Sequence, residues 1–503
     1  MAFISVPHAP RWGERFVVTV SSLDERGHGE ALLPVRIDPQ GLERIYRVTV
    51  PTAIPGDEIL VEIGKPRRKQ VRGRLVEIER PAEQRRDAPC GHFGPLDEAG
   101  TRGCGGCTLQ ALDYPSQLLQ KEARVASLLG ADNQATVQPC LPAERPWRYR
   151  NKMEFSFGDD PGRQPTVGLH AVGRRHEVID VRDCLLCSES TMGLVDVTRR
   201  WMRERGLSHH DARRDSGWLR TLTIREGEHT GERLIELTTS AVEHVETVDG
   251  VLAAEQLTGQ WAELIRGLAA EFHVVGAWWT RHDARRGHKT QLHSALLWGR
   301  PTYREELRIG DTPPLHFDVH PRAFFQPNTL QAQRIYACAI DAMGATAEDA
   351  VVADLYCGTG TIALAVARSV QRVVGVELSA EAVDNARANA ARNDIHNVEF
   401  ECGDVGAVVA RWLTESQTRF DVVMVDPPRS GLSTAAIEAV IALGAPRIVY
   451  ISCNPASLAR DVAVLHAAGY ELEAAQPVDH FPQTNHVETV AALRRSSPPA
   501  ARD

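Results

Sequence analysis

Acidic side chains follow three successive apolar segments in the last third of the chain. Asp354 begins DLYCGTGT, Glu377 ends VVGVE and Asp404 ends VEFECGD. Carboxylates at successive strand ends can accept hydrogen bonds from ribose hydroxyls and an adenine amino group, and glycines let a ligand approach the backbone closely. Each acid alone could be a helix cap, and the spacing G-x-G-x-x-A over residues 358–363 also fits a dinucleotide-binding loop. These motifs alone therefore leave the nucleotide ligand open.

The next two apolar segments end in motifs with a more specific chemistry. Asp426 lies in FDVVMVDPPRSG, which resembles the fourth-strand motif of class I methyltransferases and is not expected in an NAD-dependent dehydrogenase. Methyltransferases that act on amino groups carry an aromatic residue after the two prolines, so Arg429 at that place disfavours nitrogen as the methyl acceptor. Cys453 follows the fifth segment, in RIVYISCNP. A lone cysteine at such a place is usually a small buried apolar residue, so only its surroundings can give it a chemical role.

These side chains can meet only if the segments before them form one sheet. From about residue 349, short apolar runs alternate with helical segments, which is typical of a buried parallel sheet with helices on both faces. In such a sheet the ligand lies beyond the carboxyl ends of the strands. We therefore predict an α/β fold with a Rossmann-like class I methyltransferase domain over residues 319–495, with the site at that edge of the sheet.

Two further regions precede this domain. Residues 10–82 contain short β-branched runs broken by turn formers, which predicts a small OB-like β-barrel. The motifs GHGEA (27–31) and PGDE (55–58) resemble the TRAM domain, an RNA-binding barrel. A generic small barrel that binds no ligand would show the same sequence pattern. Residues 83–318 begin with a stretch rich in Pro, Gly and Cys, which needs something other than a core to hold it. They continue as a mixed α+β middle domain with mainly antiparallel strands.

Composition and charge limit the class of protein. The chain has 503 residues, of which 43% are hydrophobic and 24% charged, and this suits several globular domains. A net charge of -9 argues against a surface that is basic throughout, but the runs 65–74, 145–152 and 281–289 are locally basic. Such runs are either nucleic-acid contacts or solvated faces. Because we see neither an export signal nor an apolar run long enough for a membrane span, we expect a cytoplasmic protein with no membrane partner, and a monomer by default.

Taken together, these motifs resemble those of the RNA 5-methyluridine methyltransferase family, which includes bacterial 23S rRNA uracil-C5 and tRNA uracil-5 methyltransferases. The resemblance covers nearly the whole chain and includes the barrel and the cysteine cluster discussed below. Its five short motifs are FFQPN from Phe324, DLYCGTG from Asp354, DPPRSG from Asp426, SCNPASLARD from Ser452 and FPQTNHVET from Phe481. The pair SCNP and FP-x-T-x-H-x-E is the most specific of them.

The resemblance implies methyl transfer from S-adenosylmethionine to carbon 5 of a uridine in structured RNA. Carbon 5 of uracil is a poor nucleophile, so a thiolate must first add at carbon 6, and a base must later remove the carbon 5 proton. By resemblance, Cys453 is the nucleophile, Glu488 is the base, Asp426 holds the uracil edge and Phe324 packs near the uracil. The implied cofactor residues are Gln326, Asp354, Tyr356, Gly358, Gly360, Glu377, Asp404 and Asp426. The target base must also be extruded from the stacked RNA.

The cysteines form a second candidate site. The chain has ten of them and no visible export signal, so a disulfide framework is not expected. Cys90, Cys104, Cys107 and Cys184 resemble the ligands of the 4Fe-4S cluster of this family, and four thiolates suit such a cluster. A structural zinc site fits four cysteines equally well. The gap between the first two cysteines is longer than in the family, and Cys187 follows closely after Cys184, so the fourth ligand stays open.

Other functions remain compatible with parts of this pattern. One is an RNA-binding protein with an inactive methyltransferase fold, which intact Cys453 and Glu488 argue against. Another is a pyrimidine-C5 methyltransferase acting on DNA, where a cysteine also adds at carbon 6, although the barrel and the basic runs favour RNA. The motifs are shared by enzymes acting on 23S rRNA and on tRNA, so they do not identify the target uridine.

Overall fold

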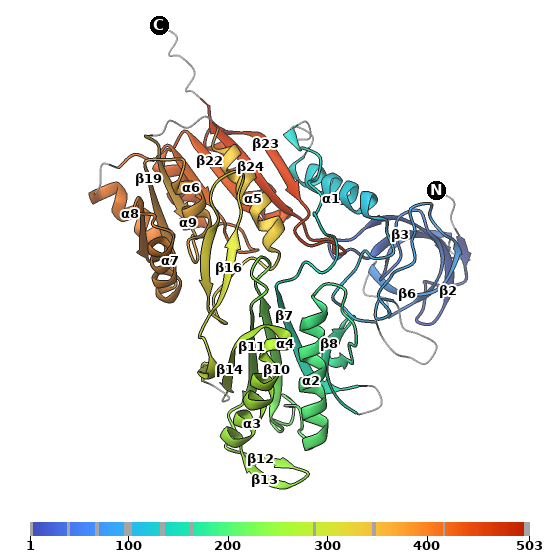
Figure 1. The fold of residues 1–503 in the computed structure, drawn as a ribbon. Helices are drawn as coiled ribbons and strands as arrows, with labels where there is room; N and C mark the ends of the chain where they lie inside the picture. Colours follow the sequence, from blue (N-terminus) through green and yellow to red (C-terminus); the bar gives the residue numbers. More distant parts are fainter. Residues whose placement is uncertain are drawn as a thin grey trace.

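The chain folds into a barrel, a middle sheet and an α/β region with a second large sheet (Figure 1). The computed structural model describes residues 4–37, 41–65, 70–94, 103–130, 136–160, 164–284, 288–344, 349–415 and 418–496. Parts of two of the basic runs, residues 66–69 and 285–287, lie outside the described residues. The fold class predicted from the sequence is confirmed by the two sheets and the barrel.

The N-terminal strands close into a barrel. Their bounds are β1 Ile4–Val6, β2 Arg15–Leu23, β3 Gly29–Ile37, β4 Leu42–Val50, β5 Glu58–Ile63 and β6 Gln70–Arg80. The barrel closes because β3 pairs with both β2 and β4, while β5 and β6 complete the circle. Alternate residues point inward, as the pattern of β5 illustrates, where Ile59, Val61 and Ile63 are fully buried. Asp57 is also buried, and its carboxylate accepts hydrogen bonds from Arg85 and from the backbone of the following segment.

The middle region is built on a seven-stranded sheet. Its elements are α1 Tyr114–Leu129, β7 Lys152–Asp159, β8 Pro165–Ala171, β9 Arg174–Ile179, α2 Glu189–Arg205, β10 Leu219–Glu226, β11 Arg233–Ser240, β12 His244–Thr247, β13 Gly250–Ala253, α3 Ala254–Gly267, α4 Ala269–Phe272, β14 Val274–Asp283 and β15 Gln291–Gly299. The strand order is β15-β14-β11-β10-β7-β8-β9, and the pairings are antiparallel except for β11 with β14. Trp201, Trp218 and Trp261 fill the core between this sheet and α2 and α3.

The C-terminal region is a doubly wound sheet with one antiparallel addition. A hairpin of β16 Tyr303–Leu307 and β17 Leu315–Val319 precedes it. The elements that follow are α5 Thr329–Ala342, β18 Val351–Leu355, α6 Thr361–Ala367, β19 Arg372–Glu377, α7 Ala380–Arg392, β20 Val398–Cys402, α8 Val405–Glu415, β21 Val422–Val425, α9 Thr434–Leu443, β22 Arg447–Ser452, α10 Pro455–Ala467, β23 Tyr470–Val478 and β24 Glu488–Arg495. The order is β20-β19-β18-β21-β22-β24-β23, and β24 runs antiparallel to both of its neighbours. The strand order therefore reverses between β18 and β21, where ligands of such sheets bind.

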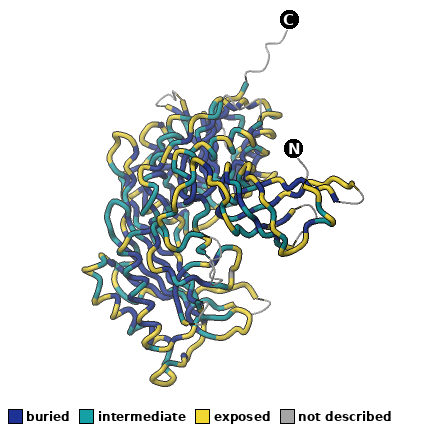
Figure 2. Tube along the Cα trace, turned by 90° about the vertical axis from the view of Figure 1, so that its right-hand side faces the viewer, coloured by how far each residue is buried: buried dark blue, intermediate teal, exposed yellow. Residues whose placement is uncertain are grey.

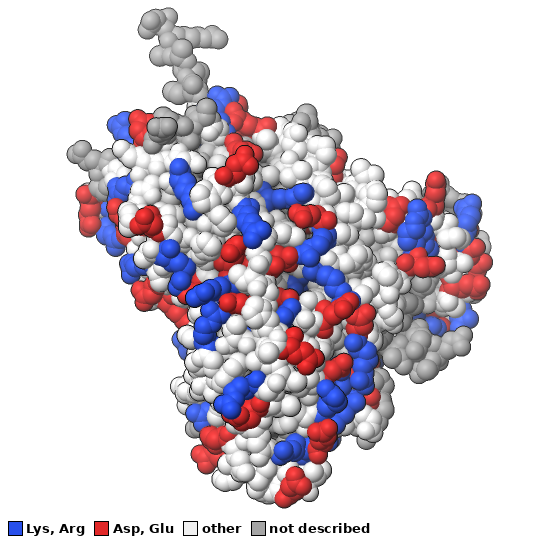
Figure 3. Space-filling model, viewed as in Figure 1, with Lys and Arg blue, Asp and Glu red and all other residues white. Residues whose placement is uncertain are grey.

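Burial and charge are distributed as expected for a globular protein. Figure 2 shows the buried segments running through the interior of the sheets. On the face seen in Figure 3, Lys and Arg side chains are interspersed with Asp and Glu, in keeping with the modest net charge. None of the described helices is both long and apolar enough to cross a membrane.

Candidate active site

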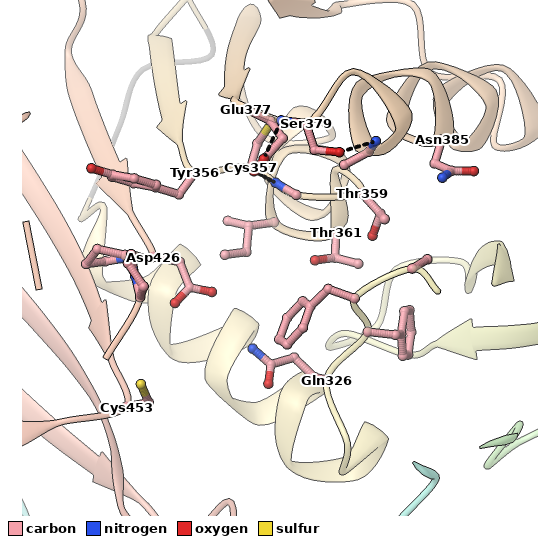
Figure 4. Close-up of a pocket in the computed structure, with 18 of the residues that line it drawn as sticks. Gln326, Tyr356, Cys357, Thr359, Thr361, Glu377, Ser379, Asn385, Asp426 and Cys453 are labelled. Atoms are coloured by element: carbon pink, nitrogen blue, oxygen red, sulfur yellow. Dashed lines mark hydrogen bonds between the residues drawn. The ribbon is translucent and has the colours of Figure 1, made fainter. Parts of the chain in front are cut away.

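A pocket of about 610 Å³ lies at the carboxyl ends of β18, β19, β21 and β22. This size suits a small-molecule ligand. Figure 4 shows that side chains from several elements converge on it, with Gln326 and Asp426 between the glycine loop and Cys453. The residues singled out in the sequence that line the pocket are Phe324, Gln326, Tyr356, Gly358, Glu377, Asp426, Cys453 and Glu488.

The loop after β18 is shaped by backbone conformations that leave its amide groups near the pocket. Gly358 and Gly360 have positive φ angles of 53° and 81°, and Tyr356 has a φ of 70°. A side chain at residue 360 would approach the ring of Phe400 to 2.9 Å, so glycine is required there on two counts. The Gly358 amide donates a hydrogen bond of 3.2 Å to the Glu377 carboxylate, which ties the loop to the end of β19.

Two carboxyl groups beside this loop have altered acidity. Asp354 is fully buried, and desolvation together with the charge of Asp426 raises its pKa to about 7. Asp426 is half-buried at the pocket wall, and desolvation raises its pKa to about 7 as well. Asp404 differs from both, because it is exposed, does not line the pocket and accepts a hydrogen bond of 3.2 Å from the Ala407 amide at the start of α8.

Cys453 and Glu488 lie at the neighbouring ends of two paired strands. In the antiparallel pairing of β22 with β24, Ser452 is opposite Thr489; Cys453 directly follows β22, and Glu488 is the first residue of β24. Burial and the nearby carboxyl of Glu488 raise the pKa of the Cys453 thiol to about 11. Burial and the charge of Asp426 raise the pKa of Glu488 to about 8. The sequence prediction that these two groups share one site is therefore supported by their register and by their common pocket.

The segment before α5 forms the opposite wall of the pocket. Gln326 lines the pocket, and its backbone carbonyl accepts a hydrogen bond of 2.8 Å from Asn151 of the middle region. Phe324 is 66% exposed, which is unusual for a phenylalanine and leaves its ring free to contact a ligand at the pocket rim.

Comparisons with known proteins agree with this geometry. A model of the tRNA (uracil-5-)-methyltransferase family matches residues 281–407, and a methyltransferase-domain model matches residues 347–489. A protein of Protochlamydia amoebophila named as an uncharacterized RNA methyltransferase is 37% identical over 453 residues, which span 88% of this chain and 99% of that protein. A protein of Clostridium tetani with the same kind of name is 34% identical, over 89% of this chain and 93% of its own length.

The chain belongs to the RNA uracil-5-methyltransferase family. The resemblance stated from the sequence motifs is thereby confirmed. Among solved structures, the tRNA (uracil-54, C5)-methyltransferase of Pyrococcus abyssi in complex with S-adenosyl-L-homocysteine superimposes with a TM-score of 0.68 at 23% identity, over 95% of this chain and 100% of that one. The two proteins therefore share their fold. Because class I methyltransferases take their methyl group from S-adenosylmethionine, this RNA methyltransferase is an S-adenosylmethionine-dependent enzyme.

Several pocket residues of this RNA methyltransferase were not identified as site residues from the sequence, and three of them bear on the chemistry of the site. Arg429 lines the pocket, and its charge lowers the pKa values of Cys453 and Glu488. Tyr336 on α5 also lines it, and its hydroxyl lies 3.2 Å from that of Thr361. Phe481 contributes a ring from the loop before β24. Arg429 and Phe481 stand inside the motifs DPPRSG and FPQTNHVET and could have been found there, whereas Tyr336 lies on a helix with no motif of its own.

The four cysteines of the second candidate site line one small cavity of the RNA methyltransferase, of about 20 Å³. They are Cys90, Cys104, Cys107 and Cys184. Burial raises the pKa of Cys104 and of Cys107 to about 12 each. Cys187 does not line the cavity, but its thiol donates a hydrogen bond that lowers the pKa of Cys184 to about 7. Within the described part of the chain, no three His, Cys, Asp or Glu side chains are arranged as ligands of one metal ion.

Proposed function

We propose that this RNA methyltransferase transfers the methyl group of S-adenosylmethionine to carbon 5 of a uridine, through a covalent bond between Cys453 and carbon 6 of the base. The observation that carries the proposal is the placement of a thiol and a carboxyl at the ends of the paired strands β22 and β24, inside the pocket that also contains the glycine loop. A nucleophile and a base so placed can act on two neighbouring atoms of one ring.

Cys453 acts first. Its thiolate adds to carbon 6, the electron pair of the carbon 5–carbon 6 bond moves to form an enolate, and carbon 5 becomes nucleophilic. The methyl donor supplies an electrophilic methyl group attached to a sulfonium sulfur. Because burial and two carboxyl groups raise the pKa of Cys453 to about 11, the Arg429 cation is needed to favour the thiolate and to balance the enolate charge.

Glu488 acts last. Its carboxylate takes the proton from carbon 5, the electron pair returns to the ring, and the bond between carbon 6 and the Cys453 sulfur breaks to release a thiolate. A base with a pKa of about 8 is well matched to this task near neutral pH, because it holds the proton strongly while still being partly ionised. Asp426 lines the same wall and is proposed to hold the polar edge of the uracil, with Phe324 packing near the base.

The cofactor is proposed to lie along the loop after β18. The Glu377 carboxylate accepts hydrogen bonds from the ribose hydroxyls, and Tyr356 and Gly358 lie beside the nucleoside. Gln326 positions either the methionine part of the cofactor or the target uracil. Asp354 and Gly360 do not line the pocket, and they act by supporting the conformation of the loop after β18. Asp404 is proposed to accept a hydrogen bond from the adenine amino group, although it does not line the pocket and already caps α8.

The cavity of four cysteines is proposed to hold a 4Fe-4S cluster, with zinc as the alternative. The four cysteines that line one small cavity supply the donor type of either group, although their side chains are not arranged as ligands of one ion within the described residues. Cys184 faces the cavity and Cys187 does not, which favours Cys184 as the fourth ligand. A bound cluster would cross-link segments that are far apart in the sequence. The methyl transfer does not require its redox chemistry.

The RNA partner is proposed to be 23S rRNA or tRNA. The relative from Pyrococcus abyssi is a tRNA uracil-54 enzyme, but the likeness to it shows only a common fold. We assign residues 10–82 as a TRAM-like RNA-binding barrel, 83–318 as the cysteine site and middle domain, and 319–495 as the methyltransferase domain. The protein is proposed to act as a cytoplasmic monomer.

One experiment tests the chemistry and the target together. RNA from a strain lacking the gene is analysed by mass spectrometry for 5-methyluridine, and the strain is complemented with the wild-type protein or with Cys453→Ala. We expect one rRNA or tRNA position to lose its methyl group, the wild-type protein to restore it, and the variant to fail by a factor of at least about 10⁴ in rate. Methylation by the variant, or no loss of 5-methyluridine in any RNA, would contradict the proposal.

A further inference from the structure

The loop between β23 and β24, residues 479–487, supplies one wall of the active-site pocket. Phe481 lines the pocket, and Glu488 follows directly at the start of β24. Around the Phe481 ring, His480 packs edge-on at a centroid distance of 4.6 Å and the Arg150 guanidinium lies 5.7 Å from the centroid. We call this segment the wall loop, and its position determines the width of the pocket beside Cys453.

The buried face of helix α1 contacts the wall loop through two polar side chains. Gln117, Lys121, Val125 and Leu129 form the buried face of the helix, and the first two are only 1% and 0% exposed. A fully buried lysine is costly unless it is paired. Lys121 is paired with the equally buried Asp479, and it also donates a hydrogen bond of 3.1 Å to the carbonyl of Phe481. Figure 1 shows α1 beside β23, where these contacts are made.

Gln117 makes the contacts at the middle of the wall loop. Its side-chain amide donates to the side-chain oxygen of Gln483 at 3.0 Å, and its own oxygen accepts from the Gln483 backbone amide at 3.1 Å. Gln483 has a φ of 66°, a strained conformation for a residue other than glycine, which persists only where the surroundings enforce it. The Gln117 side chain is part of what enforces it.

The cysteine site reaches the same residue. The amides of Thr108 and Leu109, which directly follow Cys107, both donate to the carbonyl of Gln483, at 2.9 and 3.0 Å. The barrel contributes as well, because the Asn485 side chain donates a hydrogen bond of 3.0 Å to the carbonyl of Asp24. Three segments of the chain, each more than 350 residues away in sequence, therefore converge on four residues of the wall loop, Asp479, Phe481, Gln483 and Asn485.

We propose that Gln117 is a positioning residue that, together with the backbone after Cys107, holds the wall loop so that Phe481 closes the pocket on the extruded uracil. The inference rests on the proposed function, because it assigns a role in base capture within the same site. Gln117 does not line the pocket; it contacts the wall loop through Gln483, and its side-chain amide also donates to the carbonyls of Leu109 at 3.1 Å and Leu112 at 2.8 Å. Stacking of a base on an aromatic side chain contributes roughly tenfold or more to binding, so displacing the ring should cost about that factor in capture.

The test uses 23S rRNA and tRNA transcripts that carry 5-fluorouridine in place of uridine. With fluorine at carbon 5 and S-adenosylmethionine present, methyl transfer leaves carbon 5 without a proton for Glu488 to remove, so the covalent bond to Cys453 persists. The rate of adduct formation therefore reports on base capture, thiol addition and methyl transfer, but not on elimination. The full-length protein is compared with Gln117→Ala and with Gln120→Ala, which removes a glutamine of the same helix outside the buried face. Binding of S-adenosylmethionine is measured on the same samples.

We expect Gln117→Ala to form the adduct about tenfold more slowly, while S-adenosylmethionine affinity stays within about twofold and Gln120→Ala matches the wild type. Unchanged adduct formation would overturn the proposal, and so would an equal loss of cofactor affinity, because that would indicate general damage to the fold. Should Gln117→Ala not fold, Gln483→Ala removes the side-chain acceptor of one of the two hydrogen bonds and leaves the backbone one, so a smaller slowing of adduct formation is expected, again with unchanged S-adenosylmethionine affinity. An absence of any adduct with the wild-type protein would instead contradict the proposed function.

Discussion

The protein places cysteines in two cavities that differ in almost every physical respect. Cys453 lines a pocket of about 610 Å³, where burial and neighbouring carboxyl groups raise the pKa of its thiol to about 11. The four cysteines of the second site share a cavity of about 20 Å³ with mostly apolar side chains, among them Leu169 and Val181. The surroundings of a thiol, and not the thiol itself, therefore distinguish the proposed nucleophile from the proposed metal ligands.

The largest effect is expected at Glu488, the proposed general base in the large pocket. Glu488→Gln keeps the shape of the side chain but cannot take the carbon 5 proton, so we expect thiol addition and methylation to proceed and the adduct to accumulate. Turnover should fall by about 10²- to 10³-fold. Gel separation of RNA-bound protein, with release of 5-methyluridine as the second readout, measures both steps. Turnover without adduct accumulation would show that another group removes the proton.

The small cavity can be tested with two neighbouring cysteines. Cys184→Ser removes a thiol that faces the cavity, and we expect the bound iron or zinc to fall by at least about tenfold. Cys187→Ser removes only the thiol that donates to Cys184, so most of the metal should remain. Metal and sulfide content of protein purified without oxygen gives the result. Equal losses in both variants would erase the distinction between the two positions.

Arg429 influences how the reactivity of the Cys453 thiol depends on pH. Its cation lowers the pKa of Cys453, so Arg429→Met should raise that pKa further. Because the thiolate is the reactive form, the rate of adduct formation should fall at neutral pH, and the rise of rate with pH should move to higher pH. A pH profile of adduct formation from pH 6 to 9 measures the change. An unshifted profile would remove Arg429 from the activation of the thiol.

The smallest expected effect concerns stability. The folded-state pKa of Asp354, about 7, lies above its ordinary value, so the neutral carboxyl stabilises the fold below about pH 4 and this contribution is lost as the pH rises through 7. Asp354→Asn keeps the site neutral and should raise the Tm by about 2 to 4 °C at pH 8, with a smaller gain at pH 5. Thermal unfolding at the two pH values checks this. A larger gain at pH 5 would contradict the buried, neutral state of the carboxyl.

The sequence predicted those parts of the site that follow strands. Glu377 and Cys453 could be placed in one pocket because parallel strands end at the same edge of a sheet. Glu488 could be assigned only through its motif, since the antiparallel strand that carries it enters the sheet out of order. The exposed position of Asp404 was not foreseeable, because a strand-end acid and a helix cap have the same sequence signature.

The support of the site was beyond prediction. Gln117 and Gln483 are 366 residues apart, and no local pattern relates them. A lysine at residue 121 would ordinarily be assigned to a solvated helix face, yet it is fully buried because Asp479 lies opposite. Contacts of this kind depend on how distant segments pack, which periodicity and short motifs do not encode.

The antiparallel pairing of β22 with β24 has a consequence for how this gene can vary. Side chains of a strand alternate between its two faces, so inserting or deleting a single codon within either strand would turn Cys453 or Glu488 away from the other. Substitutions along these strands leave that alignment intact, and so do length changes at the carboxyl end of β24. Single-codon insertions between residues 447 and 452 should therefore be far more damaging than any apolar exchange in the same six positions.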